Sequence, residues 1–391
     1  MRTIGVVTGS RSDYGIYLPI LRRMQQDPEL KLHLIVTGMH LAHQFGFTVK
    51  TIEQDGFAIN DRIEMLLMSD TSEGLGKSLG IGVMGFAESY ARCRPDILLV
   101  LGDRLEMLAA VAASLTFRIP VAHIHGGEST EGAIDELIRH AITKMSHLHF
   151  ASTESYAHRI MQMGEQPWRV VVSGAPSLDN LSVIHLLSPQ ELEELYGLTL
   201  TDSTLLVTYH PVTLEIDETE GQMRELMSAL EERDCSVIFT YPNADAQNHL
   251  ILEMIHEFVA RNERRSQIVA NLGTQGYFSL MSHVAAMVGN SSSGIIEAAS
   301  FKLPVVNIGN RQSGRLRGKN VIDVGYAQTE IADGIKKALS AEFKASLSDL
   351  VNPYGDGQAT DRIIGKLREI KIDEVLLRKR FHREVAWQEP C

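Results

Sequence analysis

Short apolar runs alternate with amphipathic stretches along almost the whole chain, and no other feature limits the possible folds as much. Continuous apolar strands that are each followed by a helix are typical of a parallel sheet covered by helices on both faces. In the first half we predict strands at 3–8, 32–37, 97–101, 120–124, 147–151 and 169–173. Helical patterns lie between these strands at 15–26, 72–93, 104–117 and 154–163.

A second series of the same kind follows a break at residues 174–187. A helix is then predicted to start after Ser188, its N-cap. Pro189 occupies the first turn, and Glu191 supplies the carboxylate of a capping box. Strands of this series are predicted at 204–209, 235–240, 266–270, 284–289, 303–307 and 321–324. We therefore predict an α/β chain with two Rossmann-like doubly wound parallel-sheet domains, residues 1–178 and 188–365, and ligand binding in an interdomain cleft at the carboxyl ends of the strands.

Composition excludes several classes of protein. The 391 residues include 44% hydrophobic and 22% charged side chains, as globular proteins do, and the net charge of −12 argues against general binding to nucleic acid or membrane surfaces. Cys93, Cys235 and Cys391 are too scattered for a disulfide framework or a metal motif. Residues 1–8 show no signal-peptide pattern, and no apolar run approaches the roughly 20 residues of a membrane span, so we expect a cytoplasmic protein.

Two loops that follow predicted strands in the first domain carry arginines. Residues 8–15 (TGSRSDYG) offer a small-residue turn, Arg11 and a helix N-terminus, which suit an anion, although an ordinary strand–helix turn with a surface arginine has the same pattern. Residues 99–104 (LVLGDR) place Asp103 and Arg104 after a strand, where Asp103 can also be a simple helix cap.

The segment from 123 to 140 is the richest in chemistry. A strand leads through HIHGGE to Glu128, and Asp135 and Glu136 open the next helix, predicted at 131–145, so three carboxylates can converge beside Asp103 and divide acid and base roles. The predicted buried stripe of that helix consists of Ile134, Leu137, Ile138, Ala141, Ile142 and Met145.

Two plainer interpretations apply to this segment. Asp135 and Arg139 can pair at i,i+4 on a solvated helix face. His123 and His125 share one strand face and could indicate a metal, but no third nitrogen or sulfur ligand is spaced to complete a site, so we predict no metal.

The second domain supplies groups suited to phosphates. His210 follows a strand and precedes Pro211, at the carboxyl edge of the sheet, where it can contact phosphate or transfer a proton, although many histidines are simply core residues. Residues 288–297 (VGNSSSGIIE) run from a strand into a serine-rich turn and a helix, which suits a diphosphate, or is only a serine cap. Glu297, expected about two turns into that helix, can accept both hydroxyls of a ribose.

Taken together, seven segments between about residues 3 and 325 resemble the UDP-N-acetylglucosamine 2-epimerase family, in particular its hydrolysing branch, which makes free N-acetylmannosamine for sialic acid biosynthesis. The segments are TGSRSDYG, LGDRLE, HIHGGE, AIDELIRHAITK, YHPVT, GNSSSGIIE and NRQSGR. The resemblance implies the GT-B fold, with UDP held mainly by the C-terminal domain, residues 366–391 as a helix that returns to the first domain, and a homodimer or homotetramer built on N-terminal-domain helices such as 72–93.

The resemblance also implies residue roles. Arg11 and Arg104 would reach the nucleotide-sugar, and Asp103, Glu128, Asp135 and Glu136 would form the acid–base group, with the choice between Asp135 and Glu136 open. In the second domain the implied UDP-binding residues are His210, Ser291, Ser292, Glu297 and Arg311, and His210 is also needed for turnover. The expected reaction removes the C2 proton as UDP leaves C1, giving a 2-acetamidoglucal, and then adds water with inversion at C2, without cofactor or metal.

Four competing functions remain at this stage. The nearest has the same chemistry on a UDP-2,4-diacetamido-2,4,6-trideoxyhexose, on the route to legionaminic acid. A GT-B glycosyltransferase would need an acceptor but not the carboxylate cluster, and a non-catalytic UDP-sugar sensor gains little from negative charge beside an anion. A non-hydrolysing epimerase is disfavoured by the HIHGGE and AIDELIRHAITK segments.

Overall fold

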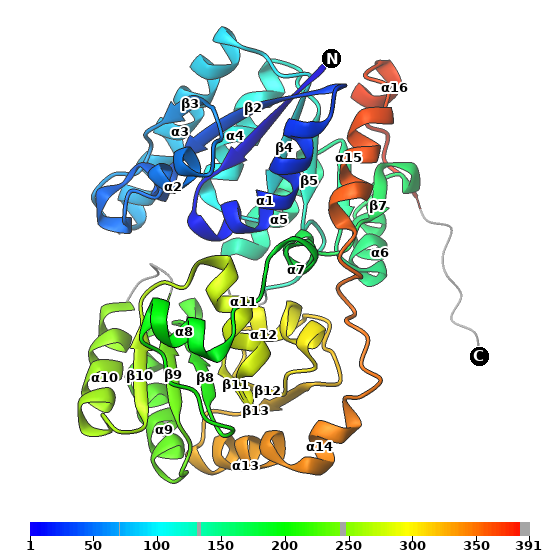
Figure 1. Ribbon diagram of the computed structural model, residues 1–391. Coiled ribbons are helices and arrows are strands. Elements are labelled where there is room, and N and C mark those ends of the chain that lie inside the picture. The colour runs from blue at the N-terminus through cyan, green and yellow to red at the C-terminus, as the bar shows by residue number, and fades with distance from the viewer. Residues whose placement is uncertain (70, 131–133, 243–247, 384–391) are drawn as a thin grey trace. The chain divides into compact units, whose positions relative to one another are not determined.

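The computed structural model describes residues 1–69, 71–130, 134–242 and 248–383, and the chain divides into two compact units (Figure 1). Unit 1 comprises Met1–Glu128, Ile134–Asn180 and Tyr354–Cys391, and unit 2 comprises Ser129–Ala133 and Leu181–Pro353. Each unit contains one parallel sheet with helices packed on its faces. The predicted fold class, two Rossmann-like parallel-sheet domains, is therefore confirmed.

The sheet of unit 1 has seven strands in the order β3-β2-β1-β4-β5-β6-β7. Its strands are β1 (Arg2–Thr8), β2 (Leu30–Thr37), β3 (Ile59–Ile63), β4 (Ile97–Leu101), β5 (Val121–Ile124), β6 (Leu148–Ala151) and β7 (Val170–Val172). All neighbouring pairs run parallel, and the strand order reverses between β1 and β4. The loops that follow β1 and β4 therefore flank a topological switch point, where doubly wound sheets bind ligands.

Helices cover both faces of this sheet because its strands are apolar on both sides. They are α1 (Arg11–Gln26), α2 (Val49–Gln54), α3 (Ser72–Arg92), α4 (Leu105–Thr116), α5 (Ile134–Met145), α6 (Glu154–Gln162), α15 (Ala359–Glu369) and α16 (Glu374–Leu377). One core packs β-strand residues against α1 and α15, and the other packs them against α3 and α4. Helix α1 begins four residues before the predicted start because Ser10 caps it, accepting the Asp13 N–H at 3.3 Å.

Strand β3 was not among the predicted strands. It is a half-exposed edge strand with the sequence INDRI, and only Ile63 is buried. An edge strand with so few apolar residues carries little of the signal by which buried strands are found.

Unit 2 repeats the architecture with six parallel strands in the order β10-β9-β8-β11-β12-β13. Its strands are β8 (Leu205–Thr208), β9 (Val237–Thr240), β10 (Ser266–Val269), β11 (Ala286–Gly289), β12 (Val305–Ile308) and β13 (Val321–Val324). Its helices are α8 (Pro189–Tyr196), α9 (Thr219–Glu231), α10 (Asn248–Arg261), α11 (Gly273–His283), α12 (Ser292–Ile296), α13 (Gln328–Leu339) and α14 (Ala341–Ser346). The predicted capping box at α8 is present, since Ser188 and Glu191 bond to each other's backbone N–H. Here the strand order reverses between β8 and β11.

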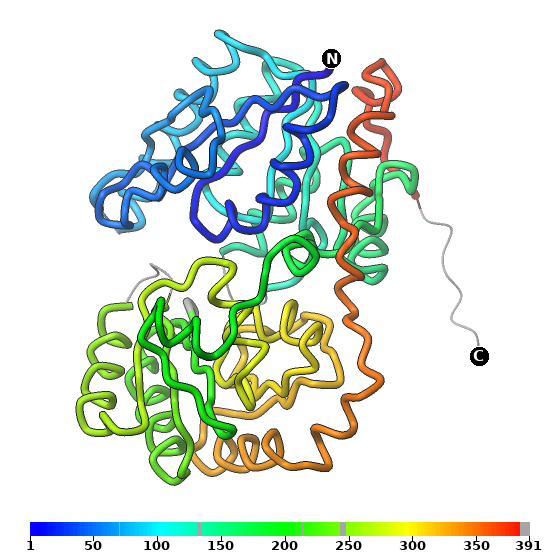
Figure 2. The backbone as a smooth tube through the Cα atoms, in the orientation of Figure 1, coloured from blue at the N-terminus to red at the C-terminus, as the bar shows by residue number. Residues whose placement is uncertain are grey.

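The chain passes into unit 2 along the short helix α7 (Asn180–Val183) and rejoins unit 1 at Tyr354 (Figure 2). This return comes before the predicted boundary at 365, because Ile363, Ile364 and Leu367 of α15 are buried in the core of unit 1. The predicted helix over 366–391 is also wrong where the structure describes it. Helix α15 ends at Glu369, α16 spans only Glu374–Leu377, and residues 384–391 lie outside the described residues.

No helix in the described part of the chain is long and apolar enough to cross a membrane.

The return of the chain to unit 1 depends on a buried carboxylate. Asp179 accepts hydrogen bonds from the backbone N–H groups of Ala359, at 3.0 Å, and Thr360, which satisfies two donors at the start of α15. We expect Asp179→Ala to lower the free energy of unfolding by about 1–3 kcal/mol, measured by urea denaturation. Asp356→Ala is the matched control, because it breaks a partly exposed ion pair with Arg362 in the same segment. An equal loss in both variants would contradict this account.

Candidate functional site

The loops after β1 and β4 bring two predicted arginines to the switch point of unit 1. Arg11 is the first residue of α1 and is exposed, and Arg104 occupies the N-cap position of α4. The Nε of Arg104 lies 3.4 Å from Oε2 of Glu106, a carboxylate that is 2% exposed. Both guanidinium groups therefore belong to the edge of the sheet at which a ligand of this fold binds.

Glu106 is a residue that the sequence analysis did not single out. Its side chain lies beneath the loop after β1, so that a Cβ on Gly9 would lie 3.2 Å from the Glu106 Cδ. It also fills the space beside Gly38, where φ is +59°. Glu106 therefore orients Arg104 and supports two glycine turns at once, and only its place within LGDRLE could have pointed to it.

Asp103 is not a helix cap. The N-cap residue of α4 is Arg104, with no side-chain capping bond, and Asp103 instead pairs with Arg139 of α5. The plainer interpretation of Asp103 is therefore wrong, and its carboxylate points toward the acidic helix.

The buried face of helix α5 differs from the one that the sequence predicts. Ile138 and Ile142 are buried as expected, but Ile134 and Leu137 are 61% and 73% exposed, and Arg139 and Thr143 are buried instead. The predicted start at 131 lies outside the described residues. The predicted buried face was wrong because the prediction counted only apolar side chains. In the structure the guanidinium of Arg139 is buried between two carboxylates.

Arg139 connects three segments of unit 1. Its guanidinium, 1% exposed, donates to Asp103, to Glu136 Oε2 at 3.1 Å and to the backbone oxygen of Glu128 at 3.0 Å. Glu136 also pairs with His140 Nε2 at 3.1 Å, and Asp135 is half-buried on the first turn of the same helix. The structure thus places the carboxylates of Asp103 and Glu136 and the backbone of Glu128 against a cation that the plainer interpretation of the sequence assigned to a solvated face.

Glu128 lies deeper than the other carboxylates. Its side chain is 3% exposed, and Oε1 accepts from Ser152 Oγ at 2.7 Å and from Nδ1 of His125. The turn that carries it needs Gly127, where φ is +75° and a Cβ would lie 2.5 Å from the Tyr156 backbone oxygen. The carboxylate is therefore held rigidly behind His125.

His123 is a structural residue. Its Nε2 bonds to the Gly102 backbone oxygen at 2.8 Å and its Nδ1 to Thr143 Oγ1 at 3.2 Å. Burial lowers the pKa of His123 to about 3, so the ring is neutral at physiological pH. Among the described residues, no group of three or more His, Cys, Asp or Glu side chains is placed to hold a metal ion.

Asn290 links the two central strands of unit 2 beyond their carboxyl ends. Its Oδ1 accepts the His210 N–H at 2.7 Å, and its Nδ2 donates to the His210 backbone oxygen at 2.8 Å. Its own backbone oxygen accepts from Arg311 Nη1 at 3.1 Å and Gln312 Nε2 at 2.8 Å. The close approach needs Gly289, where φ is +131° and a Cβ would collide with the Thr208 oxygen. Asn290 thus fixes three loops at the switch point.

His210 is at the carboxyl edge of β8, as predicted, and is 5% exposed. Burial, and then the positive charge of Arg311, hold the pKa of His210 well below its usual range. The ring is therefore neutral in the unliganded protein, and it can accept or share a proton once an anion offsets the charge of Arg311.

The helix that follows the serine-rich turn is shorter than the sequence predicts. Ser291 caps α12 by accepting the Ser293 N–H at 3.4 Å, Ser292 is its first residue, and the helix ends at Ile296. Glu297 therefore follows the helix instead of lying inside it. The residue is buried, with 8% of its surface exposed. Tyr277, which the sequence analysis missed, lies close to the hydroxyls of this turn, and burial raises its pKa to about 12.

A polar network supports the loop that carries Arg311. Tyr326 donates to Glu215 Oε2 at 2.5 Å, and Asn310 bonds to both residues. Beside this loop lies a hollow of about 590 Å³. It is lined by Gly309, Asn310, Ser313, Arg317, Asp323, Val324, Gly325, Tyr326, Glu330 and Asp333.

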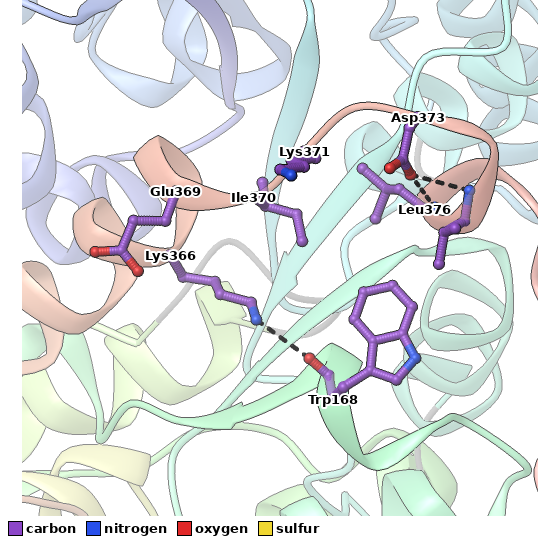
Figure 3. Close-up of a pocket in the computed structure, with 8 residues that line it drawn as sticks. Trp168, Lys366, Glu369, Ile370, Lys371, Asp373 and Leu376 are labelled. Carbon is purple, nitrogen blue, oxygen red and sulfur yellow. Dashed lines mark hydrogen bonds between the residues drawn. The ribbon is translucent and has the colours of Figure 1, made fainter.

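A second hollow, of about 300 Å³, belongs to the C-terminal segment of unit 1 (Figure 3). Lys366 donates to the Trp168 backbone oxygen at 3.2 Å at its wall, and Asp373 caps α16. The buried Arg169 stacks on Trp168 and donates to backbone oxygens at the end of α16. No predicted site residue lines this hollow, which forms where the C-terminal segment docks.

Comparison with known proteins identifies the family of this chain. The family model described as UDP-N-acetylglucosamine 2-epimerase matches residues 22–368. A Campylobacter jejuni protein named GDP/UDP-N,N'-diacetylbacillosamine 2-epimerase (hydrolyzing) is 39% identical over 96% of this chain and 97% of its own length. A Legionella pneumophila protein named UDP-N,N'-diacetylbacillosamine 2-epimerase (hydrolyzing) is 38% identical over 97% and 99% of the two chains.

The fold has a counterpart among solved structures. The Neisseria meningitidis UDP-GlcNAc 2-epimerase bound to UDP-GlcNAc superposes with a TM-score of 0.81, covering 94% of this chain and 99% of that one. The sequence identity is 18%, so this likeness concerns the fold alone.

The buried guanidinium of Arg139 gives a stability prediction. We expect Arg139→Met to lower the free energy of unfolding by about 3 kcal/mol at pH 7, because Asp103 and Glu136 lose the cation between them. Urea denaturation at pH 7 measures the loss. Arg224→Met, which breaks an exposed i,i+4 pair, is the control and should change little. An equal loss in both variants would argue against the electrostatic explanation.

Proposed function

Because this chain belongs to the UDP-N-acetylglucosamine 2-epimerase family, we propose that it is a hydrolysing 2-epimerase of a UDP-2,4-diacetamido-2,4,6-trideoxyhexose. The observation that carries the choice of sugar is the pair of relatives at 39% and 38% identity, both named as hydrolysing epimerases of a diacetamido sugar nucleotide. The sequence analysis placed UDP-N-acetylglucosamine and sialic acid biosynthesis first. These relatives give better support to its alternative, a UDP-2,4-diacetamido-2,4,6-trideoxyhexose.

The proposed reaction has two stages. A base takes the proton from C2 of the sugar, the electron pair of that C–H bond forms a C1=C2 double bond, and UDP leaves with the electron pair of the C1–O bond. Water then adds its hydroxyl to C1, and an acid delivers a proton to C2 from the opposite face. The products are UDP and the free C2 epimer, so the balance requires only water.

In unit 1 we assign the acid–base chemistry to Asp103, Glu128, Asp135 and Glu136. The support is the gathering of Asp103, Glu136 and the Glu128 backbone around Arg139, whose charge offsets the repulsion between carboxylates. Arg11 and Arg104 at the switch point would hold the sugar nucleotide's anionic groups.

In unit 2 we assign UDP binding to the residues around Asn290. His210, Ser291 and Ser292 would bond to the diphosphate, Glu297 to the ribose hydroxyls and Arg311 to the nucleotide. His210 also serves turnover, because a buried imidazole beside the departing diphosphate can stabilise the leaving group. The support is that all five residues follow strands β8, β11 and β12, at the carboxyl edge of one sheet.

UDP-N-acetylglucosamine is the second candidate substrate, because the family model carries that description and the motifs resemble the branch that hydrolyses it. A homodimer or homotetramer also stays a prediction. Leu75 and Met84 of α3, 42% and 61% exposed, are apolar side chains on the helix to which the sequence points.

The substrate is tested by following the purified protein with each sugar nucleotide by proton NMR, without any acceptor. We expect UDP and a free 2,4-diacetamido-2,4,6-trideoxyhexose inverted at C2, formed with a higher kcat/KM than N-acetylmannosamine from UDP-N-acetylglucosamine. A higher kcat/KM for the second substrate would reverse the choice of sugar. An epimer that keeps its UDP would move the chain to the non-hydrolysing branch, and no UDP release from either sugar would rule the function out.

UDP affinity tests the assignment in unit 2. Arg311→Met should weaken UDP binding about tenfold or more by calorimetry, because a charge-assisted hydrogen bond contributes about 1.5–3 kcal/mol. Arg317→Met is the control, since Arg317 pairs with Asp323 at 2.7 Å and is not among the proposed contacts. Equal affinities in the two variants would contradict a role for Arg311 in binding.

A further inference from the structure

The C-terminal segment leaves α16 at a position that a buried arginine fixes. Arg169, which is 1% exposed, donates from its guanidinium to three backbone oxygens, at 2.8 to 3.1 Å, those of Val375, Leu376 and Arg378. Three bonds from one buried cation tolerate little displacement of the chain. The residues after Arg378 are therefore directed toward a definite place on unit 1, at the ends of α5 and α6.

Glu165 is a buried carboxylate that bonds to both α5 and the C-terminal segment. Its side chain is 2% exposed. Oε2 accepts from His149 Nε2 at 3.1 Å, and Oε1 accepts from Lys144 Nζ at 2.6 Å and from Lys379 Nζ at 2.9 Å. Burial by itself raises the pKa of a carboxyl group, but the bonds from His149 and the two lysines lower the pKa of Glu165 to about 2. The ionised carboxylate therefore joins the last turn of α5 to the C-terminal segment.

Lys379 also satisfies a carbonyl group at the C-terminal end of α5. The last four carbonyl groups of an α-helix have no partner within it. The oxygens of Ile142 and Thr143 accept from Ser146, and the Lys144 oxygen accepts from Lys379 Nζ at 2.7 Å. A cation at this end also interacts favourably with the helix dipole. One ammonium group thus reaches both the buried carboxylate and the backbone of the last turn of α5.

Phe381 covers the same contact from the outside. Its ring lies over the Lys144 ammonium, with 5.4 Å between Nζ and the ring centroid. It also packs on Gly164, where φ is +90° and a Cβ would collide with the ring. The Gly164 oxygen accepts the His382 N–H at 2.8 Å, which ties the segment to the turn after α6. Lys379, Phe381 and His382 together form a C-terminal clamp on this turn and on the end of α5.

The helix that the C-terminal clamp holds carries residues of the proposed active site at its other end. Asp135 and Glu136 lie in the first turn of α5, and Lys144 lies in the last. Glu136 precedes Lys144 by eight positions, about 12 Å along the helix axis. A shift of the last turn of so short a helix also moves its first turn, and a misplacement of about 1 Å can lower a rate about 10²-fold. The C-terminal clamp can therefore affect the reaction without any contact to the substrate.

We propose that Lys379 is a positioning residue for the proposed reaction, because its bonds to Glu165 and to the end of α5 fix the helix that carries Glu136. This inference rests on the proposed function and adds to it a residue that touches neither the substrate nor the reacting atoms. The C-terminal segment is then part of what makes unit 1 active, in addition to any contribution that it makes to stability.

The test measures UDP release and amide hydrogen exchange in the full-length protein, with the better substrate of the NMR experiment. Lys379→Met keeps the aliphatic stem and removes the charge, so we expect faster exchange in the last turns of α5 and a kcat that falls about 10–100-fold, with KM nearly unchanged. Lys379→Arg keeps a cation and should restore part of the lost kcat. Arg378→Met is the matched control, because it breaks only an exposed pair with Glu374, and it should leave exchange and kcat at their wild-type values.

Urea denaturation gives the folded fraction of each variant, and kcat is expressed per folded molecule. If Lys379→Met does not fold, Phe381→Ala replaces it, since Phe381 is 71% exposed and its removal should cost little stability, and we expect kcat to fall in the same way. A wild-type kcat in the variant, or an equal fall in Arg378→Met, would overturn the positioning role, and unchanged exchange in α5 would overturn the clamp. No UDP release by the wild type would overturn the proposed function itself. The exchange measurement needs no turnover, so the two failures are distinguishable.

Discussion

The rest of the structure depends on the parallel pairing of strands. A parallel strand has to be followed by a crossover, so every loop that leaves a strand at its carboxyl end lies at the same edge of its sheet. In unit 1 this places Arg11, Asp103 and the turn of His125 and Glu128 at one edge, and in unit 2 it does the same for His210, Asn290 and Arg311. Residues up to about a hundred positions apart in the sequence thereby become neighbours.

Each edge is then fixed by one buried polar residue. In unit 1 the guanidinium of Arg139 bonds to segments that follow β4 and β5 and to its own helix, and in unit 2 the Asn290 amide joins the ends of β8 and β11. Buried polar groups are costly unless they are bonded, so such networks tolerate little displacement of the groups they hold. This rigidity suits the proposed reaction, in which a proton is removed and returned on opposite faces of a sugar.

The strands of both sheets were predictable to within two residues at each end, because they are apolar runs of the length and spacing of buried parallel strands. The exception, β3, is a half-exposed edge strand whose sequence INDRI lacks that signal. The candidate carboxylates were also found, since Asp103 and Glu128 follow strands directly. The sequence did not single out Arg139 and Glu106 as buried residues. A charged side chain in a helix is expected to be solvated unless its partners from other segments are known.

The sequence by itself determined the two α/β domains, the capped start of α8 and the family to which the chain belongs, because strand burial, capping chemistry and motif order are local properties of the chain. Only the tertiary structure decided that His123 is a core residue while His125 pairs with Glu128, that Glu297 follows its helix, and that α15 belongs to unit 1. Each of these outcomes depends on contacts between distant segments. The free energy of such contacts depends on burial and geometry that arise only when the segments pack together.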